Sequence, residues 1–116
     1  MSKRDEKLFI NDIKESVDAI LEYVEGMSFD EFITDRKTYS AVIREFEIIG
    51  EASKHLSNEL LEKYYDVDWR DIKDFRNLLI HEYFGVDFEI VWNTLHQDLP
   101  SLKSVIEEMS KEQPND

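Results

Sequence analysis

Glycine and proline are so scarce in this chain that a helical fold is strongly favoured. The 116 residues include three glycines and two prolines, and long stretches contain neither. A β-sandwich needs frequent turns, and turns are rich in these two residue types. Hydrophobic residues make up 41% of the chain, enough to fill one packed core. We therefore expect an all-α protein with a single domain over residues 1–116.

Hydrophobic periodicity and capping signals divide this domain into helices. Ser28 and Glu31 form a capping-box pattern, and Gly26 stands where a helix C-terminal glycine belongs. The predicted helices cover residues 5–25, 29–33 and 36–56, a further helix from residue 69 to 80 or 81, and a last helix from residue 88 onward, with a short turn or helix from residue 58. Pro100 is expected to kink or break the last helix, because proline lacks a backbone donor. The pattern predicts an antiparallel bundle of four or five main helices, with a frayed tail from about residue 111.

Several kinds of site and location are excluded by composition. There is no cysteine, which rules out disulfides, thiolate metal sites and cysteine nucleophiles. The three histidines are His55, His81 and His96, and no two share a helical step, so we expect no metal and no cofactor. No apolar stretch approaches the roughly 20 residues that span a bilayer. We expect a cytoplasmic protein without membrane contact.

The charge of the chain argues against general nucleic-acid binding. The formal net charge is −13, from 27 acidic and 14 basic side chains. Phosphate contacts need clustered Lys and Arg, so any RNA-binding hypothesis requires a local basic surface.

The predicted helix over residues 69–81 provides such a surface. At about 100° per residue, five polar residues fall within one arc of roughly 140°: Arg70, Lys73, Arg76, Asn77 and His81. Four apolar residues are expected to face the core: Ile72, Phe75, Leu78 and Leu79. Ile80 lies inside the polar arc, where an isoleucine is a poor choice for open water. We therefore expect a second copy of the protein to cover this face, in a two-fold dimer.

The arc also carries groups suited to cutting RNA without metal. A histidine such as His81 can move protons near neutral pH, and an arginine such as Arg76 can stabilise charge on phosphoryl oxygens. RNA supplies its own nucleophile, the 2′-hydroxyl. Five residues apart, the two side chains diverge by about 140° on one helix. They converge if the helix ends at His81 or, as we favour, if two protomers pool their residues.

A structural interpretation of the same residues remains open on spacing alone. Arg76 can be a surface ion-pair residue, His81 a helix C-terminal cation and Tyr83 an aromatic at the edge of the core. Elsewhere, Glu51 and His55 lie one turn apart, which favours a simple contact at a helix end.

Three further residues are interpreted as packing residues. Gly50 within a long helix is expected to permit close packing of a neighbouring helix. Trp69 and Trp92 lie on apolar stripes and are expected to anchor the core.

The segment from Arg76 to Tyr83 resembles the Arg-x4-His-x-Tyr signature of HepT-type proteins of the HEPN superfamily. The similarity covers about residues 8–106. It includes further motifs at Ala41–Arg44, Ile48–Ala52, Asp68–Trp69, Tyr83–Asp87, Val91–Trp92, Asp98–Pro100 and Leu102.

This resemblance implies a HEPN-like fold and a homodimer with a composite cleft. It implies that the protein is a metal-independent endoribonuclease, the toxin of a type VII-like toxin–antitoxin pair. Arg76 and His81 are then the catalytic pair, and Asn77, Lys73 and Arg70 support phosphate binding. A nucleotidyltransferase antitoxin, using ATP, is expected to adenylylate Tyr83 and so silence the toxin. Two alternatives remain: a non-catalytic module that binds a nucleotidyltransferase or a nucleotide, and a structural dimerisation domain.

Overall fold

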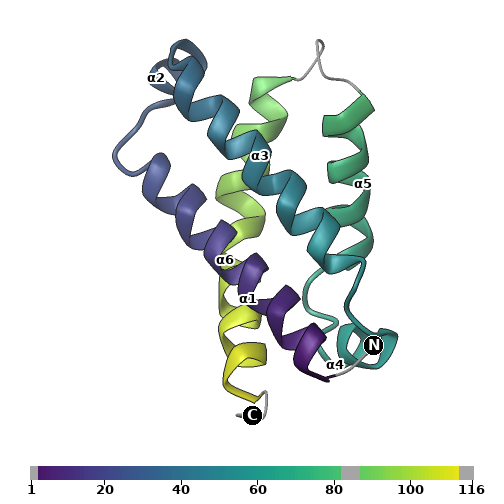
Figure 1. The fold of residues 1–116 in the computed structure, drawn as a ribbon. Helices are drawn as coiled ribbons and strands as arrows, with labels where there is room; N and C mark the ends of the chain where they lie inside the picture. The colour runs from purple at the N-terminus through teal and green to yellow at the C-terminus, as the bar shows by residue number, and fades with distance from the viewer. Residues whose placement is uncertain (1–2, 82–86, 113–116) are drawn as a thin grey trace.

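The computed structural model describes residues 3–81 and 87–112, and this part of the chain forms six helices without a strand (Figure 1). They are α1 (Lys3–Tyr23), α2 (Phe29–Thr34), α3 (Arg36–Ser53), α4 (Asn58–Lys63), α5 (Trp69–His81) and α6 (Phe88–Glu112). The predicted all-α class is confirmed, and four of the helices are long. None of the helices in these ranges is long and apolar enough to cross a membrane.

The predicted capping residues set the helix ends. The Ser28 hydroxyl accepts from the Glu31 backbone N–H, and the Glu31 carboxylate accepts from the Ser28 N–H, so the capping box is present. Gly26 has φ 74°, a left-handed conformation that favours glycine. It lies in the turn that follows the end of α1. The Asp35 carboxylate caps α3 by accepting from the Thr38 N–H at 3.1 Å.

Helix α3 is three residues shorter than predicted. The sequence pattern extends it to Leu56, but the helix ends at Ser53. The backbone N–H groups of Lys54, His55 and Leu56 each bond three residues back rather than four. These tighter bonds form the turn that leads into α4.

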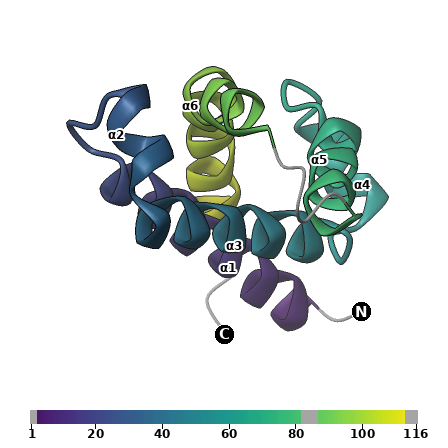
Figure 2. The same ribbon diagram turned by 90° about the horizontal axis from the view of Figure 1, so that it is seen from above.

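Helix α3 lies at the centre of the packing. It runs beside α1 on one side and is crossed by α5 near its C-terminal end (Figures 1 and 2). Helix α6 packs against α1, and the short α2 contacts both α3 and α6. Trp69 is buried and Trp92 packs against the core, as predicted. The core is closed by fully buried side chains that include Ile13, Val17, Ile20, Phe32, Val42, Ile49, Leu79, Leu95 and Ile106.

The prediction that Leu78 faces the core is wrong. Leu79 is 1% exposed, and Ile72 and Phe75 are partly buried against the core, but Leu78 is 43% exposed. The buried stripe of α5 is centred near Ile72 and Leu79, and Leu78 lies about 100° away from Leu79 on the helix. Its side chain is therefore directed away from α3.

Pro100 lies inside α6 and does not break it. A proline within a helix costs about 3 kcal/mol or more through the lost hydrogen bond and the clash with the preceding turn. Burial of the side chains on both sides of it, Leu95, Leu99 and Leu102 among them, offsets this cost.

The C-terminal end of α6 is tied to the region of α4. Glu112 accepts from the Lys63 ammonium at 2.8 Å and from the Tyr64 hydroxyl. Burial of the Tyr64 side chain and the hydrogen bond from its hydroxyl to Glu112 raise the pKa of Tyr64 to about 12. Helix α6 thus extends into the segment expected to fray from residue 111, and residues 113–116 lie outside the described part of the chain.

Candidate active site around Arg76

The candidate site begins where α5 crosses α3. A Cβ added to Gly50 would lie 2.2 Å from the Cβ of Arg76 and 2.6 Å from its Cγ. These distances are far below ordinary carbon–carbon contact, about 3.5–4.0 Å. Only a glycine on α3 lets α5 come this close. The prediction that Gly50 permits close packing is confirmed, and its neighbour is the predicted catalytic arginine.

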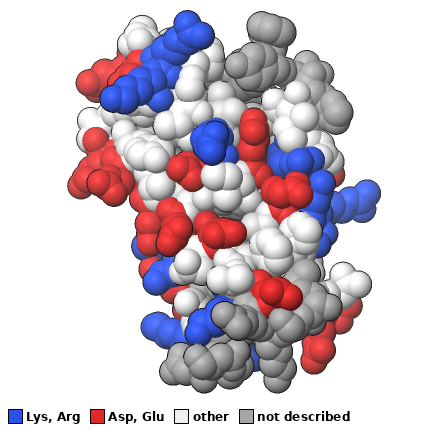
Figure 3. All heavy atoms as spheres, viewed as in Figure 1, with Lys and Arg blue, Asp and Glu red and all other residues white. Residues whose placement is uncertain are grey.

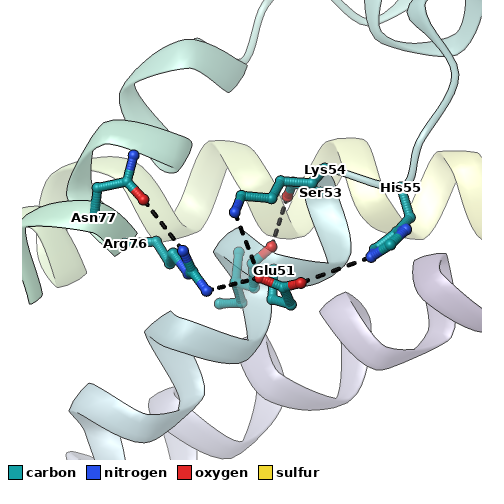
Figure 4. Close-up of polar contacts among 7 residues, drawn as sticks. Glu51, Ser53, Lys54, His55, Arg76 and Asn77 are labelled. Atoms are coloured by element: carbon teal, nitrogen blue, oxygen red, sulfur yellow. Dashed lines mark hydrogen bonds and ion pairs between the residues drawn. The ribbon is translucent and has the colours of Figure 1, made fainter. Parts of the chain in front are cut away.

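The guanidinium of Arg76 is held by two polar contacts (Figure 4). Its Nη2 lies 2.8 Å from Oε2 of Glu51 on α3. Its Nη1 donates to Oδ1 of Asn77 at 3.2 Å. The Arg76 Nε is buried and has no hydrogen-bond partner among the described residues. The side chain is still 22% exposed, so part of it is accessible to a ligand.

Glu51 is the centre of a small charged cluster at the end of α3. Besides Arg76, its carboxylate lies 3.6 Å from the Lys54 ammonium and 3.7 Å from Nε2 of His55. The predicted Glu51–His55 contact is therefore confirmed, and the His55 ring also stacks on Phe9 at 4.4 Å. Two permanent cations surround this one carboxylate, so the cluster keeps a net positive charge.

The contact between Glu51 and Arg76 was not predicted from the sequence. The two residues are 25 positions apart and lie on different helices, beyond the reach of any helical-spacing rule. One signal pointed in this direction: a glycine within a long helix, directly before the glutamate, marks the place where another helix approaches.

The basic surface predicted on α5 is present, but acidic side chains lie beside it. Arg70 is exposed and Lys73 is half-buried. Figure 3 shows basic side chains gathered along the edge of the molecule where α5 lies, with acidic side chains beside them. Such a surface suits contact with one or two phosphates rather than a long stretch of RNA.

Two of the predicted site residues lie wholly or partly outside the described part of the chain. His81 is the last residue of α5, and its side chain lies outside the described part. Tyr83 lies outside the described residues altogether. Arg76 and His81 share helix α5. Asn77 and Arg76 are brought together directly, while Lys73 and Arg70 lie one and two turns earlier along α5.

A cavity among three of the helices is separate from the Arg76 cluster. It has a volume of about 390 Å³ and lies among α3, α5 and α6. Apolar side chains such as Phe46 and Phe75 form part of its lining, but Arg76 and Asn77 do not. Four carboxylates also line it, from Asp66, Asp68, Asp71 and Asp98. Their negative charge opposes a phosphate, so the candidate RNA site is the Arg76 surface and not this cavity.

Within residues 3–81 and 87–112, no three His, Asp or Glu side chains are grouped so as to hold a metal ion. The arrangement offers instead a positioned guanidinium beside basic side chains on an acidic protein. This defines a candidate phosphate-binding site.

Most of the chain matches a ribonuclease family and proteins named as its relatives. Residues 13–109 match the ribonuclease HepT-like family. The chain is 42% identical to a protein of Methanocaldococcus jannaschii named as a candidate RNase, over 92% of this chain and 98% of that protein. It is also 42% identical to the probable ribonuclease HepT of Thermococcus cleftensis, over 94% of this chain and 99% of that protein. The chain belongs to the HepT-like ribonuclease family. No solved structure matches it significantly.

Proposed function

We propose that this protein is a metal-independent endoribonuclease and the toxin of a toxin–antitoxin pair. The observation that carries this proposal is the Arg76 guanidinium, which is anchored by Glu51 at 2.8 Å on the helix that ends with His81, while the Arg76 side chain remains partly exposed. Membership of the HepT-like family supports ribonuclease activity as the class of reaction. Because the net charge of the chain is −13, most of its surface repels RNA, and phosphate contact is confined to local cations such as Arg76.

In the proposed reaction, the 2′-hydroxyl of RNA attacks the adjacent phosphorus. The P–O2′ bond forms and the P–O5′ bond breaks, which leaves a 2′,3′-cyclic phosphate and a 5′-hydroxyl end. His81 takes the proton from the 2′-hydroxyl, and a water molecule gives a proton to the departing 5′-oxygen. Arg76 stabilises the negative charge that develops on the non-bridging oxygens. The neighbouring phosphates of the RNA backbone are bound by Asn77, Lys73 and Arg70.

A homodimer forms part of the proposal. Leu78 and Ile80 are 43% and 39% exposed near the end of α5, close in sequence to the catalytic pair. Apolar side chains at this position favour coverage by a second copy. In such a dimer His81 of one protomer and Arg76 of its partner can act on one phosphate, which removes the angular divergence expected on a single helix.

The activity is tested by substitution at both proposed catalytic positions. Arg76→Ala and His81→Ala should each lower cleavage of a defined RNA by about 10²–10⁴-fold. The matched control is Arg36→Ala, an exposed arginine at the start of α3, about 21 Å along that helix from Gly50. Cleavage should persist with excess chelator and yield cyclic phosphate ends. Full activity in His81→Ala, or a requirement for added Mg²⁺, would contradict the mechanism.

Control of the activity is proposed to act through Tyr83. A nucleotidyltransferase partner transfers AMP from ATP to the tyrosine hydroxyl and releases pyrophosphate. The added phosphodiester is negatively charged and competes with RNA for Arg76. Intact-mass measurement after incubation with the partner and ATP should show a gain that Tyr83→Phe abolishes. Tyr65→Phe is the matched control because Tyr65 is 81% exposed. A mass gain that survives in Tyr83→Phe refutes this site.

A further inference from the structure

Helix α3 holds the Arg76 side chain at both of its ends. The stem packs against the backbone at Gly50, where even a single Cβ would overlap it. The guanidinium is paired with Glu51, the next residue of α3, at 2.8 Å. Two consecutive residues of one helix therefore determine where the side chain starts and where it ends.

The contact restricts the direction in which the guanidinium points. The Nε is buried, and Nη1 is engaged by Asn77 on the same helix. A guanidinium has five N–H donors, so one ion pair and one hydrogen bond leave capacity for a phosphate. An arginine that is already oriented loses less conformational freedom when its ligand binds. Without the carboxylate, the long side chain is free to sample several rotamers at the surface.

The Glu51 carboxylate does not cancel the charge that a phosphate requires. It is 51% exposed, so water and salt screen its field. It also lies 3.6 Å from the Lys54 ammonium, so it is shared between two cations. A phosphate that approaches Arg76 therefore still meets a net positive charge.

From this geometry we infer that Glu51 is a positioning residue for Arg76 in the proposed cleavage reaction. It acts by orienting the guanidinium toward the scissile phosphate and does not itself touch the RNA. This inference rests on the proposed ribonuclease function, and it assigns a role to a residue outside the Arg-x4-His-x-Tyr signature.

Steady-state cleavage of a defined RNA separates positioning from binding. Glu51→Ala should lower kcat on the order of 10- to 100-fold, as expected when a catalytic group is displaced by about 1 Å, and should change KM less than about threefold. Glu51→Gln should recover much of the loss, because its amide oxygen still accepts from the guanidinium. In an Arg76→Ala background, Glu51→Ala should have little further effect on the residual cleavage, since either change removes the same ion pair.

The control is Glu45→Gln on the same helix. Glu45 accepts from the Ser16 hydroxyl at 3.0 Å and from the Tyr23 hydroxyl at 3.1 Å, toward α1 rather than α5. This variant should keep wild-type kcat. A Glu51→Ala protein with unchanged or higher kcat, or with an altered KM alone, overturns the inference.

A second readout does not depend on cleavage. In ¹⁵N NMR spectra, the Arg76 side-chain N–H signals should show restricted rotation in the wild type and free rotation in Glu51→Ala. Free rotation in the wild type overturns the positioning role even if RNA is cleaved. A wild-type chain that shows restricted rotation but cleaves no RNA overturns the proposed function, and with it this role. Normal cleavage by Glu51→Ala alongside an inactive Arg76→Ala overturns only the inference.

Discussion

Replacing Gly50 by alanine tests the close crossing of α3 and α5 directly. In most helices this change stabilises, because alanine has a higher helix propensity by about 1 kcal/mol. Here the new methyl group would lie 2.2 Å from the Cβ of Arg76. Both Cβ atoms are fixed by their backbones, so no rotamer change can separate them. The helices must move apart.

The size of the effect follows from the overlap. Reaching an ordinary contact of about 3.5–4.0 Å from 2.2 Å requires a displacement of about 1.3–1.8 Å. Overpacking in a core typically costs 1–3 kcal/mol, and an overlap this large belongs at the upper end. After the gain in helix propensity, we expect a net loss of about 1–2 kcal/mol. For a domain of this size, that lowers Tm by roughly 4–10 °C.

Thermal and urea unfolding followed by circular dichroism measure this loss. Ser40→Ala is the matched control, because Ser40 is exposed on the same helix and alanine there should leave Tm unchanged or slightly higher. The folded Gly50→Ala protein should also lose RNA cleavage on the order of 10²-fold, since Arg76 moves away from Glu51. A Tm equal to or above that of the wild type would refute the close approach of the two helices.

Three further outcomes are expected. In the Ile80→Glu background, where no partner copy is expected to cover Leu78, Leu79→Ala should destabilise by about 2–5 kcal/mol and Leu78→Ala by less than about 1 kcal/mol, because Leu79 is 1% and Leu78 43% exposed. Similar losses would contradict the orientation of α5. Hydrogen bonds from Thr38 at the start of α3 lower the pKa of Asp35 below its usual range. The ionised carboxylate therefore stabilises the folded protein fully above the unfolded pKa, about 4. This stabilisation is lost as the pH falls through the folded pKa. The Tm advantage over Asp35→Asn should accordingly shrink in acid, and a constant difference would exclude this titration. Ile80→Glu should shift the mass measured by light scattering from dimer to monomer, while Leu8→Glu, at a 59% exposed position on α1, should not; a monomeric wild type would remove the composite site.

The candidate site could be predicted from the sequence only as far as one helix extends. Arg76, Asn77 and the end of α5 at His81 follow from periodicity within thirteen residues. The same periodicity misplaced Leu78, because the apolar stripe of α5 is wider than the surface that α3 covers. Burial depends on where the neighbouring helix lies, and an isolated helical wheel does not contain that information.

The sequence alone determined the helices, because their causes are local. Few glycines and prolines, apolar residues at helical spacing and capping side chains act within a few residues of one another. Tertiary structure decided what happens between helices. Helix α6 continues past Pro100 because the residues around the proline are buried against other helices. Arg76 pairs with Glu51, 25 positions earlier in the chain, because α5 crosses α3. Contacts of this kind depend on how two helices approach each other in space. Gly50 indicates in the sequence that another helix approaches closely, but it does not indicate that Arg76 is the residue packed against it.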